Sequence, residues 1–165
     1  MIEIVPLQPQ QIPEAKQVIY TVVKEYFLPE LTLDEMIAHF EGMSELYDVD
    51  QMEQEYLNNG GTFLVAVDEG RIIGTGALRR LEDGIGEIKR LWFLADYRGK
   101  GHGYRMMLRL FEVAREKGYQ ILRLSTDRNH QVRAIAFYTR LGFYEIPDYS
   151  GDPDPEDLCM EIKLD

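Results

Sequence analysis

The sequence predicts a single α/β domain in which helices flank a mixed central sheet of about seven strands. Three observations predict this class. Short apolar, β-prone stretches are separated by turn residues, longer stretches carry apolar residues at helical spacing, and after residue 94 the chain runs strand, loop, helix, strand. The last unit pairs its two strands in parallel through a right-handed crossover. The chain has 165 residues with no linker or internal repeat, so residues 1–165 are expected to form one domain.

The expected strands are bounded by turn and polar residues. Asp68-Glu69-Gly70 and Glu82-Asp83-Gly84 are turn sequences, so residues 62–94 are expected to form a three-strand meander. The strand segments are residues 2–7, 62–67, 71–81, 86–94, 121–126, 143–146 and 158–164.

Apolar residues spaced three and four positions apart predict the helices. Thr32 is an N-cap candidate, and Glu35 three residues later completes a capping-box pattern. Gly118 and Gly142 end the last two helices, because glycine adopts the left-handed conformation common at helix C-termini. The helical segments are residues 11–27, 32–40, 50–57, 103–117 and 132–141.

The net charge of −11, from 18 Lys and Arg against 29 Asp and Glu, is unevenly distributed. Residues 1–70 carry two basic and fourteen acidic side chains, a net charge of −12. Residues 71–140 carry fifteen basic and seven acidic side chains, a net charge of +8. Residues 141–165 carry one basic and eight acidic side chains, a net charge of −7. The overall sign argues against nucleic acid or an anionic membrane as a partner. The basic centre and acidic flanks indicate one partner for each sign, or else an unevenly charged but functionally silent surface.

Other global features exclude several classes of protein. Cys159 is the only cysteine, so no intramolecular disulfide is possible, and it is expected to be a small core residue rather than a nucleophile. His39, His102 and His130 are not at ligand spacing, so no metal site is expected. No apolar run reaches the roughly 18 residues that span a bilayer. Residues 1–6 lack the pattern of a signal peptide, so a cytoplasmic protein is expected.

The loop between the fourth strand and the strongest helix is rich in glycine and basic residues, reading Tyr97-Arg98-Gly99-Lys100-Gly101-His102-Gly103. Its glycines let the backbone turn sharply and expose consecutive N–H groups, which favour an anion at a helix N-terminus. Arg98, Lys100 and Arg105 add positive charge, so the loop suits a diphosphate. The alternative, a glycine-rich loop that only turns, leaves these basic residues unexplained.

Two familiar phosphate loops do not match this segment. No Ser or Thr follows Gly-Lys, as a P-loop requires. The run Gly101-His102-Gly103-Tyr104-Arg105-Met106 ends in Met where the dinucleotide-binding G-x-G-x-x-G motif has Gly, and it follows the fourth strand rather than the first.

Arg98, Gly101 and Gly103 match the pattern R-x-x-G-x-G. A second block, Ala134-Ile135-Ala136-Phe137-Tyr138-Thr139-Arg140-Leu141-Gly142-Phe143, has the signature A-I-x-x-Y-x-x-x-G-F. On these two blocks the sequence resembles the GNAT family of acyl-CoA-dependent N-acetyltransferases. The resemblance covers residues 62–143, whereas residues 1–60 match only in arrangement, a strand followed by helices.

The resemblance implies an acetyl-CoA site. The main chain of Leu91, Trp92 and Phe93 would pair with the pantetheine arm as if with another strand. Many relatives have Asn seven residues before the helix tyrosine; here Gln131 holds that position, and Asn129 lies two residues earlier. Backbone amides of the loop would hold the pyrophosphate, from Arg98, Gly99, Lys100, Gly101, His102 and Gly103.

The resemblance also implies two catalytic residues. Tyr138 matches the tyrosine that protonates the departing CoA thiolate; the alternative is a core aromatic. Glu87 matches a position where relatives carry a carboxylate that deprotonates the amine. The alternative for Glu87 is a structural salt bridge, and Lys89 and Arg90 would lower its pKa if they share its face.

The implied reaction is direct attack of a primary amine on acetyl-CoA, the acyl donor, with no metal. A non-catalytic acyl-CoA sensor of the same fold and a nucleotide-phosphate binding module are the alternatives. Acidic residues fill segments 28–60 and 147–157, which suggests a cationic small-molecule or peptide amine, or else serves only solubility. Lys89 and Arg90 would instead favour a carboxylate-bearing acceptor. The two terminal strands offer edges for a homodimer.

Overall fold

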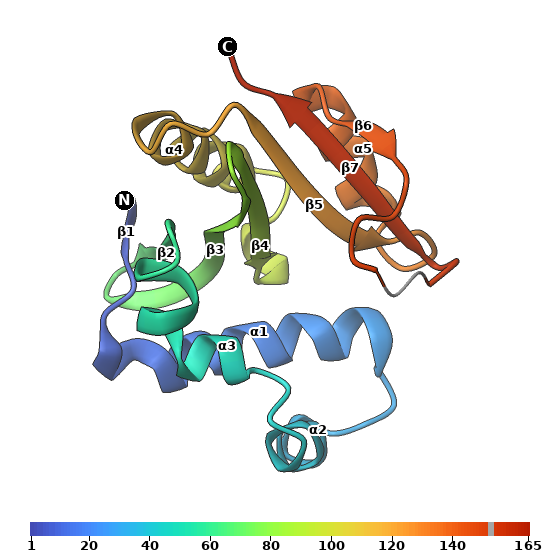
Figure 1. Cartoon of the computed structure of the whole chain (residues 1–165). Helices are drawn as coiled ribbons and strands as arrows, with labels where there is room; N and C mark the ends of the chain where they lie inside the picture. Colours follow the sequence, from blue (N-terminus) through green and yellow to red (C-terminus); the bar gives the residue numbers. More distant parts are fainter. Residues whose placement is uncertain (152–153) are drawn as a thin grey trace.

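The computed structural model describes residues 1–151 and 154–165. Within that part of the chain one sheet contains seven strands in the order β1-β2-β3-β4-β5-β7-β6 (Figure 1). The predicted fold class is confirmed, and each strand ends within one residue of its predicted bounds. The strands are β1 Ile2–Pro6, β2 Thr62–Asp68, β3 Arg71–Glu82, β4 Ile85–Phe93, β5 Ile121–Asp127, β6 Tyr144–Ile146 and β7 Asp157–Lys163.

The pairing of β4 with β5 creates the opening in which the site lies. It is parallel, as predicted, and joins only Ile85–Glu87 to Ile121–Arg123. The other neighbouring strands pair antiparallel. Beyond Glu87 the two strands diverge (Figure 1). Among the described residues, the second half of β4 therefore has no strand hydrogen-bonded to it on the side that faces β5.

A β-bulge lies at the start of this unpaired half of β4. Thr75 of β3 pairs with Trp92 and Ala77 pairs with Lys89, so two residues of β4, Arg90 and Leu91, lie opposite one of β3. Arg90 has a φ of 56°, which is uncommon for a residue with a side chain. The Thr75 hydroxyl donates a 2.6 Å hydrogen bond to the Arg90 carbonyl. Because a bulge bends its strand, this contact sets the direction of the last residues of β4.

Helices cover both faces of the sheet (Figure 1). As predicted, Thr32 and Glu35 form a capping box: the Thr32 hydroxyl accepts from the Glu35 N–H at 3.1 Å, and Glu35 accepts from the Thr32 N–H. The single helix predicted over residues 50–57 is wrong. A four-residue helix ends at Asp50, Gln51 leaves the helical conformation (φ −101°, ψ 37°), and a π-helical turn follows. The elements are α1 Ile12–Phe27, α2 Leu33–Gly42, α3 Tyr47–Asp50, η2 Glu53–Leu57, α4 His102–Glu116 and α5 Val132–Leu141.

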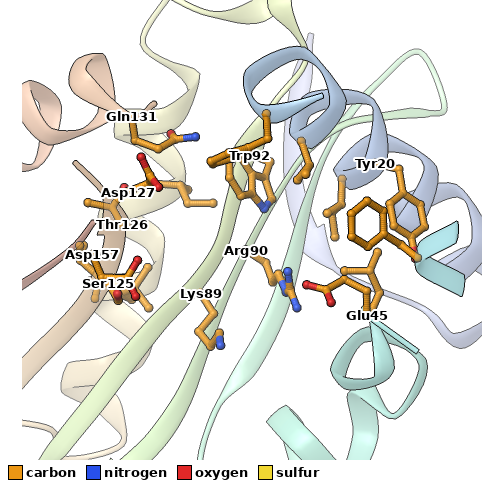
Figure 2. A pocket seen from close by; sticks show the side chains of 18 of the residues that line it. Tyr20, Glu45, Lys89, Arg90, Trp92, Ser125, Thr126, Asp127, Gln131 and Asp157 are labelled. Atoms are coloured by element: carbon orange, nitrogen blue, oxygen red, sulfur yellow. The ribbon is translucent and has the colours of Figure 1, made fainter. Parts of the chain in front are cut away.

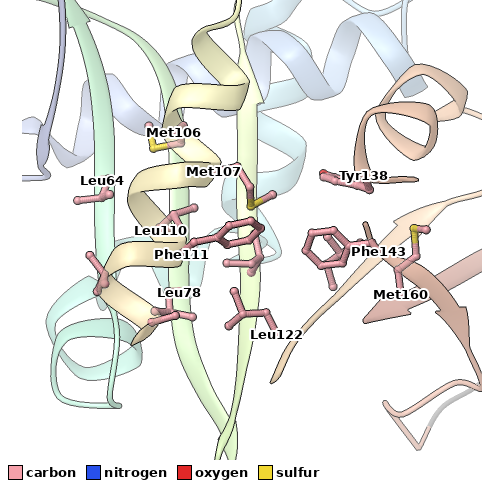
Figure 3. Packing of buried hydrophobic residues seen from close by; sticks show 14 of the residues in the cluster. Leu64, Leu78, Met106, Met107, Leu110, Phe111, Leu122, Tyr138, Phe143 and Met160 are labelled. Carbon is pink, nitrogen blue, oxygen red and sulfur yellow. The ribbon is translucent and has the colours of Figure 1, made fainter. Parts of the chain in front are cut away.

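Two apolar cores hold the layers together. One lies between the sheet and α4, whose Met106, Met107, Leu110 and Phe111 pack with side chains of the strands (Figure 3). The other lies between the sheet and the three helices α1 to α3. Cys159 is buried, as expected of a small core residue. In the described part of the chain, no helix is both long enough and apolar enough to cross a bilayer.

Candidate active site

The loop after β4 presents a row of free backbone N–H groups. Gly99 and Gly101 have φ values of 75° and 87°, and Gly101 is the N-cap of α4. No N–H group of residues 99–104 donates a hydrogen bond to another described residue. The first turn of α4 carries no acidic side chain. The positive end of this 15-residue helix and its unpaired amides are therefore open to an anion.

The Arg98 side chain anchors this loop rather than reaching out of it. Its Nε donates to the Phe93 carbonyl at 2.7 Å, and its Nη1 bonds the Tyr26 hydroxyl at 3.1 Å and pairs with Glu25. The guanidinium also lies over the Tyr26 ring, 5.0 Å from its centre. On the other side of the loop, the Tyr97 hydroxyl donates to Asp68 at 2.7 Å. These contacts tie the loop to β4, α1 and β2.

Two cavities adjoin the second half of β4. The loop cavity, of about 480 Å³, is bounded by the glycine-rich loop, the end of β4 and α5. The helix cavity, of about 420 Å³, is bounded by α1, α2, β4 and the ends of β5 and β7 (Figure 2). Both are lined by Leu91, Trp92, Gln131 and Tyr138. These four residues form the wall where the two cavities meet.

This shared wall carries polar groups that lack partners. Gln131 is buried, and its Nε2 makes no hydrogen bond with a described residue; the same holds for the buried Nε1 of Trp92. Buried donors without a partner are rare in folded proteins, and at a cavity wall they mark places where a ligand or water accepts. Tyr138 is also buried, and burial raises the pKa of its hydroxyl. The phenol carries its proton at neutral pH, as tyrosine ordinarily does, and burial makes it a weaker acid.

The geometry suits an extended ligand with an anionic end. The free loop amides can hold the anion, and Arg133 and Arg140 of α5 add positive charge to the loop cavity. The unpaired side of β4 can bond an extended polar chain as a further strand would. Such a ligand would follow β4 from the loop to the shared wall. Sequence reasoning did not single out the two arginines, although their spacing of seven places them on one face of α5.

A family comparison matches most of the chain. The model of the acetyltransferase (GNAT) family matches residues 24–143. The chain belongs to the GNAT acetyltransferase family.

Similar proteins include named N-acetyltransferases. An uncharacterized N-acetyltransferase of Escherichia coli, YjgM, is 35% identical over 106 residues, which are 62% of this chain and 62% of that protein's length. An IAA acetyltransferase of Azospirillum brasilense is 37% identical over 104 residues, covering 62% of this chain and 67% of that protein. The chain thus matches about two thirds or less of the length of these relatives.

Solved GNAT structures share the whole fold. An acetyltransferase of the family from Staphylococcus aureus superposes with a TM-score of 0.82 at 23% identity, and the match covers 100% of both chains. The PaiA N-acetyltransferase of Thermoplasma acidophilum, solved in complex with coenzyme A, gives a TM-score of 0.77 at 23% identity over 99% of each chain.

Most of the residues expected to bind the cofactor in this GNAT chain line the loop cavity. They are Leu91, Trp92, Phe93, Arg98, Gly99, Gly101, Gly103 and Gln131. The exceptions are Lys100, which is exposed, and His102, whose ring lies against Tyr97 with 6.3 Å between ring centres. Asn129 lies outside both cavities, and its N–H donates to Asp127 at 2.9 Å. Gln131 is therefore the amide side chain that the fold brings to the site.

Glu87 lies on β4 but lines neither cavity. Arg79 Nε donates to one of its carboxylate oxygens at 2.9 Å, and the Tyr149 hydroxyl donates to the other at 2.7 Å. This arrangement favours the structural salt bridge that the sequence left open. The sequence suggested Lys89 and Arg90 as the neighbouring charges, whereas the partner is Arg79, which lies directly opposite on β3.

The two cationic side chains of the helix cavity differ in whether they have an ion-pair partner. Arg90 forms a two-point ion pair with Asp48, at 3.0 and 2.7 Å. Burial alone would raise the pKa of Asp48, but the Arg90 guanidinium outweighs it and holds that pKa below its usual value. Lys89 has no hydrogen-bond or ion-pair partner among the described residues, and burial lowers the pKa of its ammonium. Lys89 is thus the cation of this cavity that no described carboxylate contacts, although Glu87 and Asp48 attract it at longer range.

Most of the acidic residues that suggested a cationic acceptor lie elsewhere. Of the flanking acidic residues that the structure describes, only Glu45 and Asp157 line the helix cavity. Glu41 and Asp50 instead pair with Lys16, at 2.6 and 2.9 Å. Residue 152, also in that acidic set, lies outside the described residues. Within residues 1–151 and 154–165, no cluster of three His, Cys, Asp or Glu side chains is placed to hold a metal ion.

Proposed function

We propose that the protein transfers an acetyl group from acetyl-CoA to a primary amine. One observation carries this proposal: the loop cavity, with its free amides, and the helix cavity meet at a wall that includes Tyr138. A donor in the first cavity and an acceptor in the second would place their reacting groups beside this tyrosine. Holding two reactants in line can account for about 7–11 kcal/mol of a barrier.

Each part of the site has a role in this reaction. The amides of residues 99–104 would hold the pyrophosphate, and the unpaired half of β4 together with Gln131 would bind the pantetheine arm. The amine nitrogen bonds to the acetyl carbon, the carbon–sulfur bond breaks, the nitrogen loses a proton and the sulfur gains one. Tyr138 would supply the proton to sulfur. Both oxygens of Glu87 are engaged, so deprotonation of the amine is not assigned to Glu87.

Calorimetry followed by a turnover assay tests this function. We expect acetyl-CoA to bind, ATP not to displace it, and free thiol to appear only when an amine is added. Binding without amine-dependent thiol release across a broad panel would indicate an acyl-CoA sensor instead. Displacement of acetyl-CoA by an equal concentration of ATP would indicate a general nucleotide-phosphate module.

A further inference from the structure

We propose that the acceptor is a small amino acid: an amine that also carries a carboxylate, held by Lys89, and an apolar side chain, held by α1 and α2. This inference rests on the proposed function and names the substrate class of the helix cavity. It is carried by three different parts of the wall of that cavity, which are seen together in Figure 2.

The first part is the unpaired cation. Five charged side chains line the helix cavity: Glu45, Lys89, Arg90, Asp127 and Asp157. Of the two cations, Arg90 donates from Nε and Nη2 to the two carboxylate oxygens of Asp48, whereas Lys89 has no hydrogen-bond or ion-pair partner among the described residues. Lys89 is half-buried on β4, where its ammonium loses hydration; Glu87 and Asp48 attract it at longer range, but no described carboxylate contacts it as a counter-ion. A carboxylate on the acceptor would supply that counter-ion through a charge-assisted hydrogen bond.

The second part is the acidic wall where β5 meets β7. Asp127 and Asp157 are direct partners in the strand register, and both line the cavity. The Asp127 carboxylate already accepts from the N–H groups of Asn129 and His130, whereas the Asp157 carboxylate forms no hydrogen bond with a described residue; the backbone N–H of Asp157 donates to the Asp154 carbonyl. An ammonium or amine is the group that this wall attracts. The wall adjoins the place where the cavities meet, because the Gln131 N–H donates to the Asp127 carbonyl.

The third part is apolar and lies under α1 and α2. It can bury a hydrocarbon or aromatic side chain, at about 25 cal/mol for each Å² removed from water. A cavity of about 420 Å³ has the size of a small-molecule site. The apolar lining residues are Val23, Phe27, Leu28, Met36, Phe40 and Leu46.

The three parts together disfavour a polyamine. A second ammonium on the acceptor would meet the apolar end, face Lys89, whose like charge repels it, or reach Glu45, which is exposed and so attracts it through screening water. A molecule with one amine and one carboxylate satisfies both the acidic wall and Lys89.

Matched substrate pairs test the inference. The pairs are L-phenylalanine with 2-phenylethylamine, and L-leucine with 3-methylbutylamine, each differing by a carboxylate; spermidine is added as a polyamine. For the wild-type protein we expect kcat/KM to be at least about tenfold higher for each amino acid than for its decarboxylated partner. In Lys89→Met the amino-acid value should fall by about the same factor while the amine value stays, so that the ratio approaches one.

Lys117→Met is the matched control, because Lys117 is exposed and lies in neither cavity. It should keep the wild-type ratio, and acetyl-CoA affinity should be equal in all three proteins. Equal losses for both members of a pair in Lys89→Met would overturn the inference, since Lys89 would then act on the amine or on the fold. Preference for spermidine or for the decarboxylated amines would also overturn it.

A binding arm separates this inference from the proposed function. If acetyl-CoA binds but no amine in the panel is acetylated, the proposed function fails. Calorimetry of each amino acid into the protein saturated with CoA then decides the inference. Binding to the wild-type protein that is lost in Lys89→Met supports it, and no binding to the wild-type protein contradicts it.

Discussion

Tyr138 is the residue at which the proposed donor and acceptor sites meet. Its place in the A-I-x-x-Y-x-x-x-G-F block identified it in the sequence, but the sequence could not separate a catalytic role from a core one. In the structure Tyr138 is buried and also lines both cavities, so a packing position and access to the proposed site coincide in one residue. Burial raises the pKa of its hydroxyl, so the phenol is protonated at neutral pH but is a weaker acid than an exposed tyrosine.

Tyr138→Phe should lower kcat by about 10²-fold, the usual effect of losing a proton-transfer group. The affinity for acetyl-CoA should be unchanged, because the ring and its packing remain. Steady-state kinetics with calorimetry measures both quantities. An unchanged kcat would show that Tyr138 serves only packing.

Glu87 is a residue for which the geometry favours structure over catalysis. Glu87→Gln removes the charge that pairs with Arg79, so the free energy of unfolding should fall by about 1–3 kcal/mol. The pH dependence of kcat/KM should keep its wild-type shape. Chemical denaturation and a pH–rate series test this together, and disappearance of the acid limb of the profile would restore Glu87 as the base.

The limits of sequence reasoning at this scale have a physical cause. The residues of the glycine-rich loop could be identified from the sequence because they form one continuous segment, so their spacing in the chain also determines their positions in the structure. The Arg79–Glu87 pair depends on strand register, which the local pattern does not reveal. The choice of Gln131 over Asn129 depends on which side chain points into the opening when α5 begins at Val132.

At the scale of elements, the start of α4 determines the proposed donor site. Gly101 is in the left-handed conformation with open space where a Cβ would lie, and so is Gly118 at the other end of the same helix. Substituting each of these two glycines separates the effect of backbone strain, which both positions share, from an effect on ligand binding, which is expected at Gly101 alone.

Gly101→Ala and Gly118→Ala should each lower the free energy of unfolding by about 1 kcal/mol, because a Cβ is disfavoured at positive φ. Only Gly101→Ala should also weaken acetyl-CoA binding, since its Cβ and any backbone adjustment lie at the free amides. Thermal denaturation and calorimetry on both variants check this. Equal affinities would argue against pyrophosphate binding at the loop.

The sequence predicted regular elements better than irregular ones. The Thr32 capping box and the strand bounds depend on local chemistry and were correctly predicted. The β4 bulge was not foreseen, because Arg90 gives no local sign that it will adopt a positive φ. A tertiary contact, the hydrogen bond from Thr75, holds that conformation. The break in the helix at Gln51 was likewise not predicted, because the helical spacing of apolar residues gave no sign of it.

At the scale of the whole molecule, the uneven charge has a structural explanation. Part of the acidic N-terminal segment neutralises buried or half-buried cations, with Asp48 on Arg90 and Glu41 and Asp50 on Lys16. The basic centre contains the loop and α5, which surround the loop cavity. The sequence located this basic region but could not show which carboxylates remain in the acceptor cavity, because ion pairing between distant segments decides that.

The Asp48–Arg90 pair predicts a pH dependence of stability. The pKa of Asp48 lies below its ordinary value of 3.8, so the pair stabilises the fold above that pH and the stabilisation is lost as pH falls through the lowered pKa. Asp48→Asn should lower the free energy of unfolding by about 2–3 kcal/mol near neutral pH, less than for a fully buried pair. The difference in the free energy of unfolding between Asp48→Asn and the wild-type protein should become smaller as the pH falls.

Urea denaturation across a pH series measures this difference. Asp34→Asn serves as the control, because Asp34 is exposed and forms no ion pair with a described residue. A difference between Asp48→Asn and wild type that widens below the ordinary carboxyl pKa would contradict the account.

We propose that this GNAT protein moves an acetyl group from acetyl-CoA to an amine nitrogen. The most direct measurement is mass spectrometry of an amine panel after incubation with the protein and isotopically labelled acetyl-CoA. We expect the label on the nitrogen of at least one amine, at a rate strongly reduced in Tyr138→Phe. Label that stays on CoA, or appears only as free acetate with every amine, would contradict it.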